Sequence, residues 1–275
     1  MSVSFCPLAS GSGGNCSFIS SGNTSVLIDA GLPCVSAERA LFSINKNFGD
    51  ISAILITHEH GDHVSGAGII SRRYNIPIYA TRGTWESIGR NRQTGKLSSD
   101  NKRIIEAGSE FTVGDITVKA FEIPHDANEP VGFAFFIGGG TDSERYKIVT
   151  ATDMGEPNDT IRENLKDSDV LLIESNHDVE MLINGKYPPY LKKRILGAEG
   201  HLSNVSAGQL ICDVASKNLK HVFLGHLSEE NNRPLIAVDT VCRILNANGI
   251  KTNCENGVRI SVAERYAASA IVELN

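Results

Sequence analysis

The densest set of potential metal ligands lies in the stretch Thr57-His58-Glu59-His60-Gly61-Asp62-His63. Its four candidate ligands are His58, His60, Asp62 and His63. Imidazole and carboxylate together suit Zn²⁺, Mn²⁺ or Fe²⁺, and ligands this dense suit more than one ion. A histidine-rich surface loop without metal is the weaker interpretation, because histidines packed this closely would repel one another when protonated. The motif therefore predicts a site for more than one divalent cation.

The elements around this motif predict how it is held. Residues 51–56 are short, apolar and β-branched, which is typical of a buried strand. The ligands would then lie on the loop that leaves the carboxyl end of this strand. An apolar-periodic segment at about residues 64–74 predicts a helix after the loop.

The same arrangement recurs along the chain. Further candidate side chains each follow a predicted strand: Asp29, His125, Asp153, His177 and His226. Residues at successive strand ends converge on one rim of a sheet, where α/β proteins build their sites. The sequence therefore predicts that these side chains meet the His58 motif.

The remaining pattern predicts an α/β protein with two sheets packed face to face and helices outside. Antiparallel strands are expected at residues 103–105, 110–113 and 116–121, and a closing hairpin at residues 250–262. Ser203 or Asn204 would cap a helix of about residues 205–215, and another helix is expected at residues 231–245.

Composition places the chain among ordinary globular proteins. Its 275 residues are 41% hydrophobic and 21% charged, and we expect a single domain over residues 1–275. The sequence contains no apolar run of membrane-spanning length and no signal-peptide pattern, so no membrane partner is expected. Six scattered cysteines without a CxxC motif favour reduced thiols and a cytoplasmic location. Oligomeric state is not indicated.

Charge is distributed unevenly. The net charge is −6, yet residues 72–103 hold eight basic and two acidic side chains, a local +6. A solvated face is one interpretation, and a surface that contacts a nucleic-acid backbone is the other. The arginines of that candidate surface are Arg72, Arg73, Arg82, Arg90 and Arg92. A second basic cluster comprises Lys186, Lys192, Lys193 and Arg194.

The pattern HxHxDH, followed by single His, Asp and His residues at strand ends, resembles the metallo-β-lactamase superfamily over about residues 3–262. The resemblance implies a four-layer αβ/βα sandwich with two divalent metal ions (Zn, Mn or Fe). By position it implies that His58, His60 and His125 hold one metal. Asp62, His63 and His226 would hold the other, with Asp153 bridging and Asp29 orienting the histidine loop.

Several short motifs are similar to the YycJ/WalJ branch of that superfamily. They are Ser-Gly-Ser-Gly-Gly-Asn-Cys at residues 10–16, Pro-His-Asp-Ala at 124–127, Thr-Asp-Met-Gly at 152–155, Glu-Ser-Asn-His-Asp at 174–178 and Gly-His-Leu-Ser-Asn at 200–204. This branch implies nuclease activity on DNA ends, hence a phosphodiesterase. Asp153 at the bridging position disfavours the classical zinc β-lactamases. The short interval between Asp153 and His226 leaves no room for the long insertion of RNase J.

The hypothesis for catalysis is a hydroxide that a dinuclear centre activates and that Asp62 and Asp153 hold. His201, expected at a helix N-terminus, would protonate the leaving oxygen. His177 would orient a ligand or contact substrate. Gly-His-Leu-Ser occurs at 200–203 and at 225–228, so either histidine could be the last ligand, and His226 is preferred because a strand end is more rigid.

Two other functions use the same residues. A hydrolase of thioesters or lactones could use the same metals, but the basic segment 72–103 favours a phosphodiesterase because acyl substrates need no polyanion track. A non-catalytic metal-binding protein predicts broken ligands, and no ligand position is broken.

Overall fold

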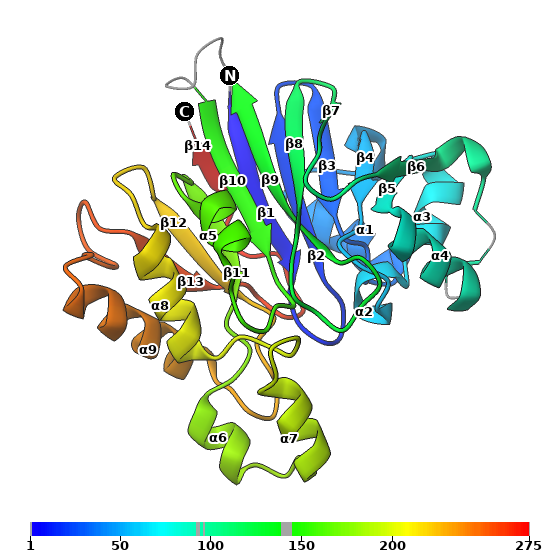
Figure 1. Ribbon diagram of the computed structural model, residues 1–275. Coiled ribbons are helices and arrows are strands. Elements are labelled where there is room, and N and C mark those ends of the chain that lie inside the picture. Colours follow the sequence, from blue (N-terminus) through cyan, green and yellow to red (C-terminus); the bar gives the residue numbers. More distant parts are fainter. Residues whose placement is uncertain (1, 92–93, 96, 139–144, 275) are drawn as a thin grey trace. The chain divides into compact units, whose positions relative to one another are not determined.

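The computed structural model describes residues 2–91, 94–95, 97–138 and 145–274 (Figure 1). Over these residues the strands form two mixed seven-stranded sheets flanked by helices. The chain divides into two compact units. The first consists of Met1–Phe121, Ala127–Tyr146 and Glu264–Asn275, and the second of Glu122–Asp126 and Lys147–Ala263. The single domain expected over residues 1–275 stays a prediction.

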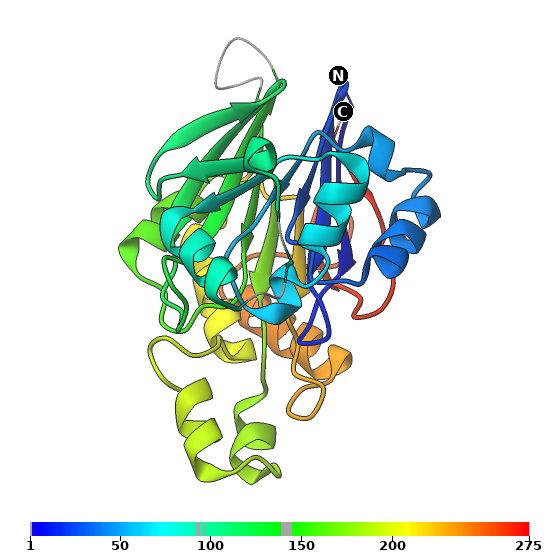
Figure 2. The same cartoon turned by 90° about the vertical axis from the view of Figure 1, so that its right-hand side faces the viewer.

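One complete sheet lies in the first unit, with the order β14-β1-β2-β3-β4-β5-β6. Pairing is antiparallel from β14 to β3 and parallel from β3 to β6. The pairing of β14 with β1 places the two chain ends side by side (Figures 1 and 2). The strands are β1 (Val3–Ala9), β2 (Cys16–Ser21), β3 (Thr24–Ile28), β4 (Ala53–Leu55), β5 (Ile78–Thr81), β6 (Lys102–Ile105) and β14 (Val272–Leu274).

Four helices follow the strands of this sheet. They are α1 (Cys34–Ser43), α2 (Gly61–Val64), α3 (Ala67–Tyr74) and α4 (Arg82–Asn91). Their apolar side chains join those of β1 to β5 in one buried cluster, which includes Phe18, Leu41, Ile54 and Ile70. This cluster fixes the carboxyl end of β4, from which the histidine motif emerges.

The helix expected at residues 64–74 is wrong in its boundaries. The chain turns earlier, because the backbone N–H groups of His63 and Val64 donate to the His60 carbonyl at 2.9 and 3.2 Å. The result is the short helix α2, and α3 begins only after Gly66. A Cβ on Gly66 would lie 2.0 Å from the Leu32 carbonyl oxygen, so the chain can pass this close only with glycine. Asp62 and His63 therefore sit in a helical turn, not in the loop that the sequence predicted.

The first unit also contains β7 (Glu110–Val113), β8 (Ile116–Glu122), which ends one residue into the second unit, and β9 (Val131–Gly138). β7 and β8 pair antiparallel, as predicted. The strand at residues 102–105 does not join them, which corrects the prediction of three antiparallel strands. It pairs parallel with β5 instead, because α4 carries the chain back across the sheet between the two strands.

The second unit has a parallel sheet at its centre, formed by β10 (Arg145–Ala151), β11 (Val170–Glu174), β12 (His221–Gly225) and β13 (Arg259–Val262). The closing hairpin expected at residues 250–262 is wrong, since β13 runs parallel to β12 after the crossover helix α9. The helices are α5 (Asp159–Leu165), α6 (Val179–Asn184), α7 (Pro189–Ile195), α8 (Asn204–Val214) and α9 (Pro234–Ala247). Within this unit α6 and α7 stand apart from α8 and α9 (Figure 1).

Two further features bear on the sequence expectations. None of the helices in the described part of the chain is long and apolar enough to cross a membrane. The six cysteines are free.

His221, the first residue of β12, gives the second unit a dependence on pH. It is buried, stacks on Phe223 and lies 2.7 Å from the Ser261 hydroxyl through Nε2. Burial, with a contribution from Arg259, lowers its pKa to about 4. The unfolded chain takes up this proton below about pH 6.5, so the stability is present above that pH and is lost as the pH falls toward 4.

We expect wild type to lose about 2 kcal/mol more unfolding free energy between pH 7 and pH 5 than His221→Gln does. Urea unfolding at both pH values, at one fixed metal concentration, measures this difference. Equal losses in the two proteins would show that His221 is not the titrating group.

Candidate metal centre

The histidine motif in the first unit forms a buried cluster of imidazoles just beyond β4. His58 and His63 have no exposed surface, and their ring centroids lie 4.1 Å apart. The ring of His60 meets that of His58 edge-on at 4.6 Å. Asp62 contributes a carboxylate oxygen 3.5 Å from His63 Nε2. The structure thus brings together the four predicted ligands of the motif.

Asp29 holds two of these rings in orientation. Its carboxylate accepts from His63 Nδ1 at 2.7 Å and from the Thr57 backbone N–H at 2.9 Å. The Thr57 hydroxyl donates to Asp29 Oδ2 at 3.0 Å and lies 3.0 Å from His58 Nδ1. Both histidines therefore use Nδ1 for a protein partner, so Nε2 is the nitrogen that would coordinate a cation. In His63 this Nε2 also faces the Asn15 side-chain amide. The family resemblance implied such an orienting role for Asp29, and this role stays a proposal.

Burial raises the pKa of Asp29, and the hydrogen bonds from His63 and Thr57 oppose that rise. These donors offset part of the cost of burying the carboxyl group.

Asn15 also belongs to this cluster, although the sequence did not identify it as a site residue. Its side-chain amide lies 3.0 Å from His63 Nε2 and donates to Asp62 Oδ2 at 3.2 Å. Its backbone N–H donates to the Asp62 carbonyl at 2.7 Å. The available signal was the turn-rich motif at residues 10–16, but turn composition alone does not show what an asparagine side chain faces.

Three candidate residues share an unusual backbone conformation. Asp29, Asp153 and His226 have φ angles of 59°, 57° and 53°, a region that non-glycine residues seldom adopt. Each lies one or two residues past the end of a strand: β3, β10 or β12. Such strain costs on the order of 1 kcal/mol or more per residue and persists where surrounding contacts impose it, commonly at functional sites.

The second unit holds a cluster around Glu174, the last residue of β11. Asp153, Glu174, His201 and His226 offer donor atoms that lie within 4.8 Å of one another. Nδ1 of His201 and Nδ1 of His226 lie 2.8 and 2.9 Å from the same oxygen, Glu174 Oε1. The second carboxylate oxygen accepts the backbone N–H groups of Met154 at 2.8 Å and Leu202 at 3.2 Å.

Glu174 therefore works as an anchor. Burial raises the pKa of Glu174, but the facing His201 and the hydrogen bonds from His201 and His226 outweigh it and hold this pKa at about 2. Burial likewise lowers the pKa of His201, and the Glu174 carboxylate more than reverses that effect, so this pKa lies above 6.5. Because both oxygens of Glu174 already have partners, we assign it to orienting the two histidines.

Glu174 was not predicted as a site residue, and His177 was the residue predicted at this strand end. Glu174 ends a buried strand and is itself fully buried, and that position was the signal that could have identified it. His177 lies three residues further on, where its carbonyl accepts a hydrogen bond from the Asn204 N–H, and its side chain lines a pocket that His201 also borders.

His125 joins the Glu174 cluster from the loop after β8. Its Nε2 lies 4.0 Å from Asp153 Oδ1, and its ring centroid lies 5.4 Å from that of His201. The neighbouring Asp126 accepts hydrogen bonds from Nε and Nη2 of Arg194 at 2.5 and 2.9 Å, and these bonds connect the loop to α7. The second unit thus brings together all of its predicted ligands and His201.

The basic segment lies in the first unit. Arg82 and Arg90 are exposed, with Arg90 3.8 Å from Glu86. Arg73 packs against the Tyr74 ring, and Arg72 donates to the Thr94 carbonyl at 2.8 Å. Arg92 lies outside the described residues.

Comparison with known proteins identifies the family. The model of the β-lactamase superfamily domain matches residues 24–227. Exodeoxyribonuclease YycJ of Bacillus anthracis is 37% identical over 90% of this chain and 91% of its own. Exodeoxyribonuclease WalJ of Streptococcus pneumoniae serotype 2 is 39% identical over 82% of this chain and 81% of its own. The chain belongs to the YycJ/WalJ family of the β-lactamase superfamily.

A solved structure supports the fold of this YycJ/WalJ family member. The metallo-β-lactamase fold protein YhfI from Bacillus subtilis superposes with a TM-score of 0.67 at 16% identity, covering 98% of this chain and 99% of the other. The predicted family and α/β sandwich fold are confirmed, as is the prediction of a hydrolase of this fold. The fold implies divalent metal ions.

The donor atoms fit such ions. Imidazoles that are buried, oriented through Nδ1 partners and accompanied by carboxylates are the ligand chemistry of Zn²⁺, Mn²⁺ and Fe²⁺. The individual ligand assignments and the number of ions remain proposals.

Replacing the carboxylate that orients the histidines should weaken metal binding without removing a ligand. Asp29→Asn keeps the shape of the side chain but turns one oxygen into an amide that cannot accept from His63 Nδ1 or Thr57. We expect metal affinity to fall about 10- to 100-fold. Competition with a chromophoric chelator measures it, and an affinity equal to wild type would remove Asp29 from this role.

Proposed function

We propose that this YycJ/WalJ family member is a metal-dependent exonuclease that hydrolyses phosphodiester bonds at DNA ends. The ligands are those predicted from the sequence: His58, His60, Asp62, His63, His125, Asp153 and His226. They hold two divalent cations chosen among Zn²⁺, Mn²⁺ and Fe²⁺. The observation that carries the proposal is the Nδ1 anchoring of His58, His63 and His226, which presents each Nε2 as a ligand.

The relatives support the nuclease assignment. Both are called exodeoxyribonucleases and match over more than four fifths of their lengths. The exposed arginines of α4 supply the positive charge that a nucleic-acid backbone requires.

The residues divide the reaction between them. Bound cations would supply a nucleophile at neutral pH and offset the charge of the phosphodiester. Asp62 and Asp153 accept hydrogen bonds from the attacking oxygen and orient it. His201 carries a proton on Nε2 for the leaving oxygen, while Glu174 fixes its Nδ1 and raises its pKa.

Hydrolysis of labelled DNA ends tests the proposal. Purified protein is assayed on duplex DNA labelled at the 5′ or the 3′ end, with Mn²⁺, Zn²⁺ or Fe²⁺ added after chelation. We expect stepwise loss of terminal nucleotides that needs added metal. Hydrolysis of thioesters or lactones without cleavage of DNA would replace the proposal with the acyl-hydrolase alternative.

The basic segment makes a separate prediction. Arg82→Ala with Arg90→Ala should weaken DNA binding and reduce the salt dependence of binding, by about one unit of slope for each phosphate that the variant no longer neutralises. Fluorescence anisotropy at several salt concentrations measures the slope, and Lys217→Ala with Lys251→Ala in the second unit is the charge-matched control. An unchanged slope would place the DNA track elsewhere.

A further inference from the structure

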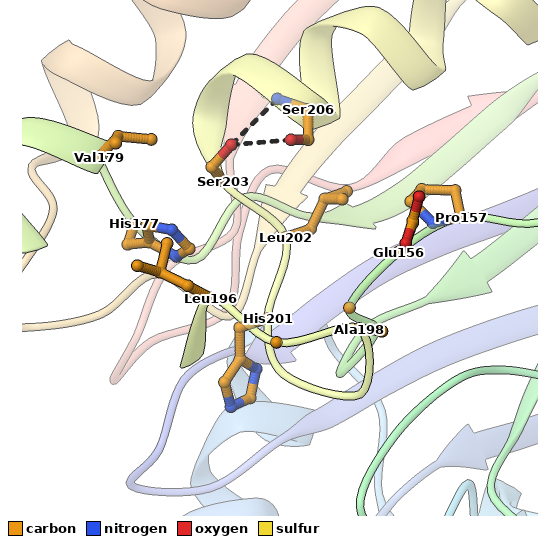
Figure 3. A pocket seen from close by; sticks show the side chains of 12 residues that line it. Glu156, Pro157, His177, Val179, Leu196, Ala198, His201, Leu202, Ser203 and Ser206 are labelled. Atoms are coloured by element: carbon orange, nitrogen blue, oxygen red, sulfur yellow. Dashed lines mark hydrogen bonds between the residues drawn. The ribbon is translucent and has the colours of Figure 1, made fainter. Parts of the chain in front are cut away.

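A pocket of about 400 Å³ lies in the second unit beside His201 (Figure 3). It is lined by residues that follow β10, by the start of α6, by the turn after α7 and by the start of α8. His201 borders the pocket and also hydrogen-bonds Glu174, so the pocket adjoins the group assigned to protonate the leaving oxygen. A volume of this size is in the range that holds a small organic ligand.

His177 indicates that the pocket takes a ligand with hydrogen-bonding groups. Its side chain lines the pocket and is 1% exposed. Neither ring nitrogen has a hydrogen-bond partner among the described residues. Buried polar groups are seldom left in this state, because each costs about 1–3 kcal/mol. Burial also lowers the pKa of His177 to about 4, so the ring is neutral and can both donate and accept.

The remaining lining disfavours an anion. The described lining residues include no lysine or arginine, and the charged one among them is Glu156. At the start of α8 the N–H groups of Asn204 and Ser206 already donate to the His177 carbonyl and the Ser203 hydroxyl. Leu196 and Leu202 supply apolar surface. A flat, uncharged ligand with polar edges suits this lining better than a phosphate does.

We propose that this pocket binds the nucleobase of the nucleotide that carries the leaving oxygen. The inference rests on the proposed function, because it takes His201 as the donor to that oxygen. The base of this nucleotide lies between Leu196 and Leu202, and the edge of the base hydrogen-bonds His177. The enzyme then acts on a strand end whose base has left the stack, which frayed or single-stranded ends provide most readily.

Calorimetric titration of the metal-loaded protein tests the base contact without turnover. The probes are dAMP, with its phosphate at the 5′ or the 3′ position, and the matching 2-deoxyribose phosphate, so that each pair shares the phosphate and differs in the base. We expect dAMP to bind at least about tenfold more tightly, as base contacts of this kind provide. Ala198→Trp fills the pocket from an exposed position and should remove the preference, whereas Glu199→Trp, one residue outside the lining, should keep it.

His177→Phe keeps an aromatic ring but cannot hydrogen-bond the base, so it should reduce the preference for dAMP severalfold. Equal binding within both pairs of probes by wild type, or an undiminished preference in Ala198→Trp, would overturn the inference. The proposed exonuclease function is tested by a different experiment, the assay on labelled DNA. It would be refuted there by the absence of metal-dependent cleavage. A dAMP preference in a protein that cleaves no DNA would leave the base pocket standing and the exonuclease assignment refuted.

Discussion

His60→Ala is expected to lower hydrolysis of DNA ends by at least about 10³-fold and to leave less metal bound to the purified protein. A cation in such a site contributes several kcal/mol to the transition state, and each 1.36 kcal/mol is tenfold in rate. His60 is partly exposed, and its ring meets His58 at the edge, so alanine removes a ligand without opening the core below β4. Steady-state assays and elemental analysis of the same preparation measure both effects.

His221→Gln is the matched control. It too removes a histidine, but one that is buried and faces Ser261 and Phe223 instead of a ligand cluster. Its activity at pH 7 should stay within about threefold of wild type, since it changes no group near the reacting atoms. DNA cleavage that survives His60→Ala unchanged would end the metal assignment for the whole motif.

Much of this candidate site could be predicted from the sequence, because polar residues just past the ends of buried strands follow a simple rule. A polar residue just past a buried strand cannot point into the core, so it emerges at the carboxyl edge. Asp29, Asp153 and His226 all follow this rule, and all three have a left-handed backbone. The sequence could not show that conformation, because the hydrogen bonds that impose it come from segments far away in the chain.

Glu174 and His177 show where the rule stops. Glu174 is the last residue inside β11, and its importance depends on four donors, from Met154, His201, Leu202 and His226. No local pattern encodes their convergence on one carboxylate. His177 lies three residues beyond, and its ring, which makes no hydrogen bond to Glu174, lines the pocket that His201 borders.

The two topological errors have one cause. Residues 102–105 and 259–262 are short strands whose partners cannot be read from their own composition. A preceding helix, α4 or α9, returned the chain to the same edge and made each pairing parallel. The sequence alone does not decide between a local hairpin and a crossover through a helix.

His201→Ala should slow DNA hydrolysis by about 10²- to 10⁴-fold, the usual contribution of a general acid. The loss should depend on the leaving group. A deoxyribose oxygen needs a proton as it departs, whereas p-nitrophenolate leaves as an anion. Hydrolysis of bis(p-nitrophenyl) phosphate by the same variant should therefore fall much less than hydrolysis of DNA.

The comparison separates proton donation from metal binding, because loss of a ligand slows both substrates alike. Nδ1 of His201 is held by Glu174 at 2.8 Å, so the ring presents Nε2 as its working nitrogen. His201→Gln tests this further, since it restores a hydrogen-bond donor but no transferable proton and should leave DNA hydrolysis as slow as alanine does. Equal losses on DNA and on the nitrophenyl ester would instead make His201 a ligand, and proton delivery would then need another group.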